Sequence, residues 1–290
     1  MILQVNNVSK RRGNIDVLKN ISFELEPGIY GILGANGAGK TTLFHIICGL
    51  LSADTGTIRF DGKDIKKERE NFLSQIGFLP QNFTYYSNFT GLKFMLYISA
   101  LKGLDKITAK RRCVELLDLV GLSKEINVKI GKYSGGMKQR LGIAQAMISD
   151  PKVLILDEPT VGLDPKERVR FRNLISSFSD DKIVLLSTHI VSDVEYIADE
   201  ILILKQGILE NRGTSSELIH TISNCVWECE IEPQKVDYYL ENYIVSNQKH
   251  QGSKIELRIV SKDKPVLNSK PAIATLEDLY LYYFRKEETK

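Results

Sequence analysis

The strongest constraint on the fold is a glycine-rich segment at residues 34–41, with the sequence Gly-Ala-Asn-Gly-Ala-Gly-Lys-Thr. It follows a short apolar run at residues 29–33, which is typical of a buried strand. Residues 40–50 have the apolar spacing of a helix. Further short apolar runs at residues 153–156 and 183–187 are typical of a parallel sheet that is covered on both faces. We therefore expect an α/β fold.

The spacing within this loop fits a phosphate-binding pattern, in which four residues separate the first glycine from a Gly-Lys-Thr triplet. The backbone N–H groups of such a loop point at phosphate oxygens, and the following helix presents its positive end. Lys40 adds charge for the β- and γ-phosphates, and the Thr41 hydroxyl is placed to bind Mg²⁺. A glycine-rich turn without a ligand is the alternative, which the flanking strand and helix disfavour. The residues expected to bind the nucleotide here are Gly34, Asn36, Gly37, Gly39, Lys40, Thr41 and Thr42.

Two adjacent acidic residues, Asp157 and Glu158, follow the apolar run at residues 153–156. A carboxylate at the end of a buried strand is costly unless it is paired or linked to a metal. Beside Thr41, Asp157 would hold Mg²⁺ through a water, and Glu158 would polarise the attacking water. A structural cap on the strand end is the alternative, but it accounts less well for two acids in a row.

Three further segments do not indicate a function when each is taken alone. Gln81 lies two residues after the strand-like run 76–79, but most glutamines are solvated. Residues 134–136 are Ser-Gly-Gly, a common turn and helix cap. His189 follows the apolar run 183–187, and a lone histidine there is more often structural. Chance does not explain their occurrence in this order together with the glycine loop and the acidic pair.

With these five segments the chain resembles the nucleotide-binding subunits of ATP-binding-cassette (ABC) transporters, over about residues 2–220. The most specific segment is Ser-Gly-Gly-Met-Lys-Gln-Arg at residues 134–140, because ordinary phosphate-loop proteins lack it. The resemblance implies that Ser134, Gly135 and Gly136 open a helix and bind the γ-phosphate that another subunit holds. The physical basis is again a helix N-terminus that faces an anion.

The resemblance also implies roles for residues that are uninformative alone. Gln81 would contact Mg²⁺ and the attacking water, and His189 would contact the γ-phosphate. Residues 161–164 are similar to the loop that couples two sites across a dimer. One departure is Arg12, which stands where the family commonly carries an aromatic residue that stacks on adenine; an arginine can also stack on a base, so stacking and solvation both stay open. The expected catalytic residues are Glu158, His189 and Gln81, and the expected Mg²⁺ ligands are Thr41, Gln81 and Asp157.

A chain of this family is expected to be an ATPase that uses ATP and Mg²⁺. It would form a dimer with itself or with a second cassette, and it would drive a separate integral membrane permease. Its place would then be cytoplasmic, peripheral on the inner face of the cell membrane. The compact C-terminal tail resembles that of single-cassette exporters of drugs, bacteriocins and antibiotics. The alternative is a soluble regulatory ABC ATPase that acts through a non-membrane partner.

The composition limits the kinds of partner that we expect this chain to bind. The net charge is only +3, with acids and bases interspersed, so we expect no nucleic-acid partner. The four cysteines show no zinc or disulfide spacing, and we interpret them as buried reduced thiols. The longest apolar stretch, around residues 94–104, is too short to span a bilayer. Any membrane-spanning part would therefore belong to a partner.

Two domains are expected. Residues 1–221 would form the ABC ATP-binding domain, with a mostly parallel sheet core, an antiparallel β subdomain and an inserted helical subdomain at about residues 90–149. Residues 57–60 and the Asp61-Gly62 turn predict a hairpin edge. Residues 222–290 would form a small C-terminal α+β domain, with strands at 225–231 and 253–260 and helices at 233–240 and 274–284.

Overall fold

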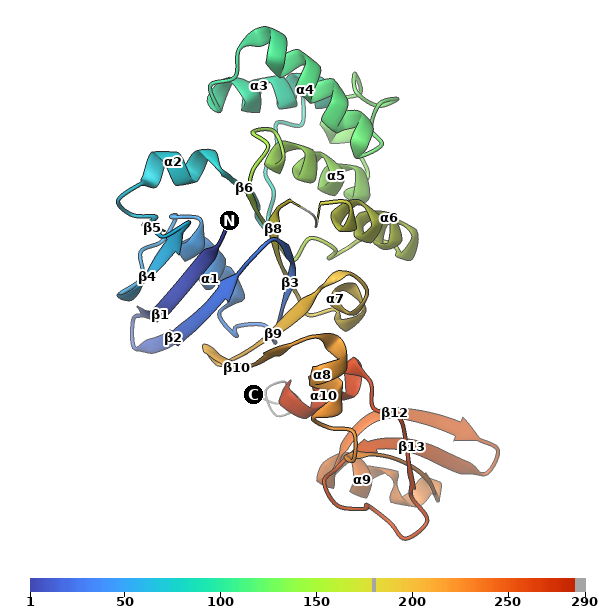
Figure 1. Ribbon diagram of the computed structural model, residues 1–290. Coiled ribbons are helices and arrows are strands. Elements are labelled where there is room, and N and C mark those ends of the chain that lie inside the picture. Colours follow the sequence, from blue (N-terminus) through green and yellow to red (C-terminus); the bar gives the residue numbers. More distant parts are fainter. Residues whose placement is uncertain (179–180, 285–290) are drawn as a thin grey trace.

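A six-stranded sheet forms the centre of the computed structural model, which describes residues 1–178 and 181–284 (Figure 1). Its strand order is β10-β9-β3-β8-β7-β6, and all neighbours except β10 and β9 are parallel. The predicted α/β fold with a mostly parallel sheet is therefore confirmed. The strands are β3 (Gly28–Leu33), β6 (Ile76–Leu79), β7 (Val153–Asp157), β8 (Ile183–Thr188), β9 (Glu200–Lys205) and β10 (Ile208–Gly213).

A second, antiparallel sheet lies beside the central one, with strand order β2-β1-β4-β5. Helix α1 (Lys40–Ile47) packs between the two sheets, and Phe44 and Ile47 are fully buried there. The predicted hairpin is present, since β4 and β5 pair on either side of Asp61-Gly62. Helix α2 (Arg69–Ser74) follows this sheet. The strands are β1 (Leu3–Arg12), β2 (Ile15–Leu25), β4 (Thr55–Phe60) and β5 (Lys63–Asp64).

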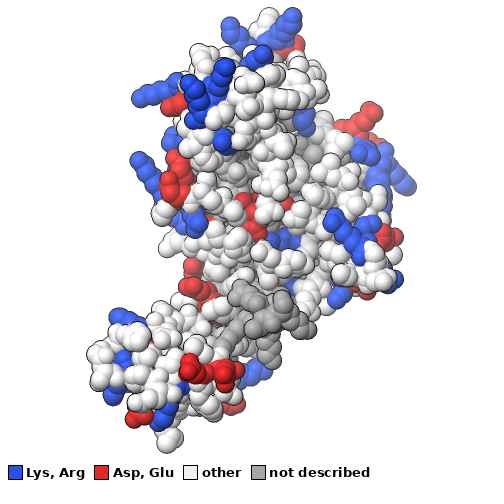
Figure 2. Space-filling view, turned by 180° about the vertical axis from the view of Figure 1, so that it is seen from behind, with Lys and Arg blue, Asp and Glu red and all other residues white. Residues whose placement is uncertain are grey.

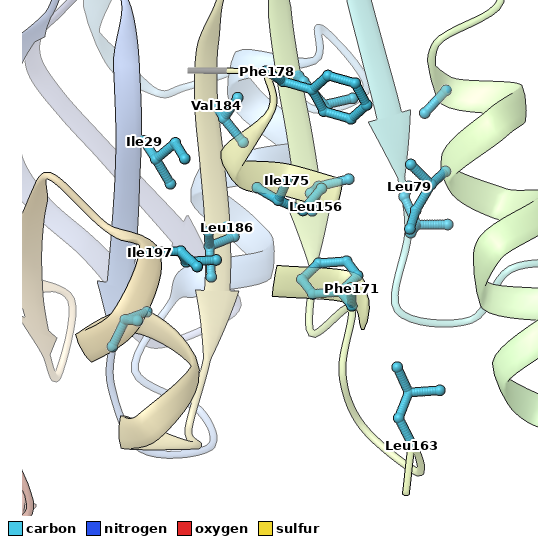
Figure 3. Close-up of a cluster of buried hydrophobic side chains, with 14 of the residues drawn as sticks. Ile29, Leu79, Leu156, Leu163, Phe171, Ile175, Phe178, Val184, Leu186 and Ile197 are labelled. Carbon is cyan, nitrogen blue, oxygen red and sulfur yellow. The ribbon is translucent and has the colours of Figure 1, made fainter. Parts of the chain in front are cut away.

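Alternate residues of the central strands face opposite layers, and both sets are buried. On one face, Leu156 and Leu186 contact α6 (Pro165–Ser176) and α7 (Val191–Ile197) (Figure 3). Phe171 and Ile175 project from α6 onto this face. The other face packs against α1 and the antiparallel sheet. Because both faces are covered, the carboxyl ends of the strands remain as the place where polar side chains gather.

The segment predicted to be helical, about 90–149, contains three helices: α3 (Gly91–Leu101), α4 (Lys106–Leu119) and α5 (Gly135–Ala146). A single 3₁₀ turn, Ile130–Lys132, lies between α4 and α5. Helices α3 and α4 lie at the top of Figure 1, at the opposite end of the molecule from the C-terminal strands β12 and β13. Figure 2 shows lysine and arginine side chains gathered at the same end. None of the helices in residues 1–178 and 181–284 is long and apolar enough to cross a membrane.

The C-terminal region holds a third sheet with strand order β12-β13-β11-β14 and its own buried cluster around Leu257 and Ile259. The prediction of two strands was incomplete, because β12 is an exposed edge strand whose polar sequence hides it. The predicted helix 233–240 is a 3₁₀ turn followed by α9 (Val236–Asn242). Residues 285–290 lie outside the described residues. The remaining elements are α8 (Ser215–His220), β11 (Val226–Ile231), β12 (Ile244–Gln251), β13 (Lys254–Val260), β14 (Lys270–Pro271) and α10 (Leu276–Phe284).

Helix α10 packs against α7 and α8 rather than only against the third sheet. Leu276, Leu279 and Phe284 belong to the same buried cluster as the residues beneath the central sheet. Asp278 of α10 binds Arg258 of β13, with Nη2 to Oδ2 at 2.8 Å, so the helix also holds the third sheet. A domain boundary between residues 221 and 222 stays a prediction.

Candidate functional site

The glycine loop leaves β3 at its carboxyl end and enters α1. Gly37 and Gly39 have φ values of 84° and 108°, in the left-handed region that favours glycine. A Cβ on Gly39 would lie 2.8 Å from the carbonyl oxygen of Val17, so no larger residue fits. The loop therefore has the conformation that its glycines predict. It opens onto a pocket lined by Arg12, Ile15, Val17, residues 35–42, Gln81 and Glu158.

Lys40 is held at the base of this pocket and is only 6% exposed. Its Nζ donates to the carbonyl oxygen of Gly34 at 2.6 Å and to that of Ala35 at 3.3 Å. It also forms an ion pair with Glu158, with Nζ and Oε1 3.2 Å apart. The loop carbonyls thus aim the ammonium group at a place where an anion can be bound.

Glu158 joins the loop to the end of a neighbouring strand. Its Oε2 lies 2.9 Å from Nδ1 of His189, and its Oε1 faces Lys40. Its φ is 49°, a left-handed conformation that costs a non-glycine residue about 1–3 kcal/mol. The backbone N–H of Glu158 donates to Ser187 Oγ at 2.8 Å, which helps to hold this conformation.

Asp157 ends β7 and is 1% exposed. Its Oδ1 accepts a hydrogen bond from Ser187 Oγ at 2.6 Å. Its Oδ2 is buried and has no hydrogen-bond partner within residues 1–178 and 181–284. A buried carboxylate oxygen without a partner is costly, and a bound cation or its water would satisfy it. Oxygen donors of this kind suit Mg²⁺.

A thiol beside this carboxylate stays protonated. Burial raises the pKa of the Cys48 thiol far above its usual value, and the negative charge of Asp157 raises it further. Because a thiol with a raised pKa is a poor nucleophile, Cys48 is a packing residue at the end of α1. All four cysteines are free thiols.

The structure brings most of the predicted residues to one place. Asn36, Gly37, Gly39, Lys40, Thr41 and Thr42 line the pocket together with Gln81 and Glu158. Gln81 reaches it from the exposed loop after β6. Gly34 is not among the lining residues; its carbonyl oxygen accepts from Lys40 Nζ, and a Cβ on it would meet the carbonyl oxygen of Leu204 at 2.5 Å.

The Ser-Gly-Gly segment at residues 134–136 lies elsewhere. Ser134 caps α5, since its Oγ accepts from the backbone N–H of Met137 at 3.2 Å. A Cβ on Gly136 would lie 2.9 Å from the Glu167 side chain, so glycine is needed there as well. In the described part of the chain, Ser134, Gly135 and Gly136 are not among the residues that line the pocket of Lys40. Their predicted role in binding the γ-phosphate stays a prediction.

Sequence reasoning missed Ser187, which bridges Asp157 and Glu158. It also missed Ile15 and Val17, which line the pocket near Arg12. Ile15 is 70% exposed at the edge of this pocket. Arg12 lines the same pocket, and both alternatives stated for it, stacking on a base and solvation, stay open.

The comparisons with known proteins agree with this geometry. The ABC transporter family model matches residues 18–161. Over 97% of its length the chain is 33% identical to the uncharacterized ABC transporter ATP-binding protein YxlF of Bacillus subtilis strain 168, covering 98% of that protein. It is 36% identical to the linearmycin resistance ATP-binding protein LnrL of the same strain, over 75% of this chain and 70% of that one. It is 34% identical to the Nod factor export ATP-binding protein I of Burkholderia orbicola strain AU 1054, over 77% of this chain and 74% of that one.

Among solved structures, a dimeric ATP-binding cassette in a post-hydrolysis state with ADP and Pi matches with a TM-score of 0.66 and 26% identity. The match covers 73% of this chain and 98% of that cassette. The match over 98% of YxlF, together with the glycine loop, the acidic pair and helix α5 with its Ser-Gly-Gly start, shows the family. The chain belongs to the ATP-binding proteins of ABC transporters and is an ATPase of that family.

Proposed function

We propose that this chain is the ATP-hydrolysing subunit of an export transporter, and that it acts at the inner face of the cell membrane on a separate permease. The observation that carries the proposal is the contact of Glu158 with both Lys40 and His189 at the mouth of the phosphate loop. The relatives named for linearmycin resistance and Nod factor export support the transport direction.

In this proposal the loop amides and Lys40 bind the ATP phosphates. Mg²⁺, held by Thr41 and Gln81 and through a water by Asp157, would neutralise charge that builds up on the transferred phosphoryl group. The buried, unpaired Oδ2 of Asp157 supports this assignment. Glu158 accepts a proton from the attacking water, and His189 orients Glu158 through the bond at its Oε2.

A second cassette would complete each site. Because Ser134 and Gly136 lie away from the pocket of their own chain, we propose that they bind the γ-phosphate held by a partner. The amides at the N-terminus of α5, a helix of 12 residues, are suited to an anion. The dimeric form of the matched cassette supports this arrangement.

The permease would dock beside Gln81. Next to this residue lies a groove lined by Pro80, Phe83, Tyr85, Tyr86 and Tyr97 among other residues. Tyr86 and Tyr97 are large side chains that stay exposed there. Clustered aromatic residues of this kind are enriched at protein interfaces. A loop that carries Gln81 on one side and the groove on the other can transmit the state of the nucleotide to a partner.

Purification of the tagged chain from gently solubilised native membranes tests the partner. A multi-spanning protein in near-equal amount is the expected result, and Tyr97→Ala should reduce its yield while leaving ATP binding unchanged. Recovery of a non-membrane partner instead would replace the export function by a regulatory one.

Size exclusion tests the dimer. With ATP and Mg²⁺, Glu158→Gln should elute as a dimer, and adding Ser134→Phe should return it to a monomer. A chain that hydrolyses ATP normally while remaining monomeric would contradict the shared sites.

A further inference from the structure

A buried hydrogen bond lies behind the contact of Glu158 with His189. Thr160 follows Glu158 by two residues, and Asp193 follows His189 by four. The Thr160 hydroxyl donates to Asp193 Oδ2 at 2.5 Å, and both residues are 0% exposed. The bond therefore joins the same two segments as the Glu158–His189 contact, at a second point.

Burying the Asp193 carboxylate costs free energy that its contacts do not fully offset. Its Oδ1 has no hydrogen-bond partner, and no cation pairs with the carboxylate, within residues 1–178 and 181–284. A carboxylate with one hydrogen bond contributes less to stability than an apolar side chain of similar shape would. Stability alone therefore does not account for an acid at this position.

The position of the bond explains what the acid does. Glu158 has a left-handed φ of 49°, and such conformations persist only where the surroundings fix them from both sides. On the strand side, its backbone N–H is held by Ser187 Oγ. On the other side, the first side-chain anchor is Thr160, which Asp193 holds to the start of α7.

We propose that Thr160 and Asp193 are positioning residues for ATP hydrolysis, which hold the Glu158 carboxylate in register with His189 without touching the nucleotide. The inference rests on the proposed roles of Glu158 and His189. It predicts that loss of the bond slows the chemical step while ATP affinity stays close to that of the wild-type chain. The glycine loop lies outside the joined segments, and the charge of Glu158 beside Lys40 is kept.

The test uses steady-state ATPase kinetics of the full chain. Thr160→Val removes the hydroxyl but keeps the shape, and it should lower kcat by about 10- to 100-fold with KM for ATP within about twofold of the wild-type value. Thr160→Ser keeps the hydroxyl and should retain most of kcat. Ser99→Ala is the matched control, because it removes another fully buried hydroxyl from the helical segment, and its kcat should stay unchanged.

A double variant separates positioning from stability. Thr160→Val combined with Asp193→Leu removes both polar partners, so its melting temperature should recover relative to Thr160→Val alone. Its kcat should stay low, because the bond is still absent. Recovery of kcat together with stability would overturn the proposal, as would a Thr160→Ser variant as slow as Thr160→Val. A wild-type chain without ATPase activity would instead contradict the roles proposed for Glu158 and His189.

Discussion

The pair of Lys40 and Glu158 makes the outcome of Glu158→Gln predictable in three separate measurements. In the structure the two charges are 3.2 Å apart and almost fully buried. At an effective dielectric constant of about 20, two unit charges at this distance attract by about 5 kcal/mol before desolvation is subtracted. Removing one partner of a buried pair costs about 3–5 kcal/mol when nothing replaces it. Glutamine keeps the shape and an acceptor oxygen, and Lys40 keeps the carbonyl groups of Gly34 and Ala35, so we expect the nucleotide-free chain to lose about 1–3 kcal/mol of unfolding free energy.

The affinity of Glu158→Gln for ATP should rise, although its unfolding free energy falls. In the wild-type chain the incoming phosphate must displace the Glu158 carboxylate from Lys40, and that carboxylate repels the phosphate charge. In Glu158→Gln the repulsion is absent and the neutral amide is easier to displace from Lys40, so the ATP affinity should rise about tenfold, which corresponds to about 1.4 kcal/mol. Turnover should fall by roughly 10²- to 10⁴-fold, the usual contribution of a general base.

Three assays measure these quantities: denaturant unfolding without nucleotide, calorimetric titration with ATP, and phosphate release under saturating ATP and Mg²⁺. The matched control is Glu217→Gln, the same chemical change at the cap of α8, outside the pocket. A wild-type turnover rate for Glu158→Gln would refute the role of Glu158 as base. ATP affinity weaker than wild type would refute the competition between carboxylate and phosphate.

Further outcomes follow from other contacts. Lys40→Ala should abolish nucleotide binding, and an unchanged affinity by calorimetry would remove Lys40 from the site. Ser187→Ala leaves Asp157 Oδ1 and the Glu158 N–H without their partner, so the unfolding free energy should fall by about 2–4 kcal/mol and the Mg²⁺ concentration for half-maximal ATPase should rise. Burial would raise the pKa of Asp278, but hydrogen bonds led by that from Arg258 outweigh it and hold the pKa below its usual value. This stabilisation is present above the unfolded-state pKa of about 3.9 and is lost as the pH falls through the folded-state pKa, so Asp278→Asn should lower the melting temperature at pH 7, with a difference from wild type that narrows below about pH 4.

The conformation of the glycine loop and the place of the two carboxylates were predictable because short segments of the sequence determine both. A loop that wraps phosphates needs glycine where φ is positive, as at Gly37 and Gly39, and those residues are visible without a structure. The carboxylates had to follow a buried strand, and the apolar run 153–156 marks that strand. Each of these signals is local, so no knowledge of the partner segment was needed.

The C-terminal sheet was predicted less completely, for a physical reason. Strand β12 lies at the edge of the sheet, and residues 247–251 are all exposed. Without a buried face such a strand has no alternating pattern to mark it. The packing of helix α10 was also only partly predictable from the sequence. Its apolar residues predict burial, but the sequence does not say that Leu279 and Phe284 pack onto the ATP-binding part of the chain.

The contacts that support Glu158 depend on strand register, which explains why they were missed and how they could be found. The run 153–156 and the apolar residues 183–186 of the run 183–187 have equal length, and parallel pairing aligns Val153 with Ile183. The same register then places Asp157 beside Ser187. A hydroxyl aligned with a buried carboxylate is its natural donor, so the Ser187–Asp157 bond follows once β7 and β8 are known to be neighbours. The bond between Thr160 and Asp193 lies beyond the strand ends, where register no longer fixes the distance, and only the folded chain reveals it.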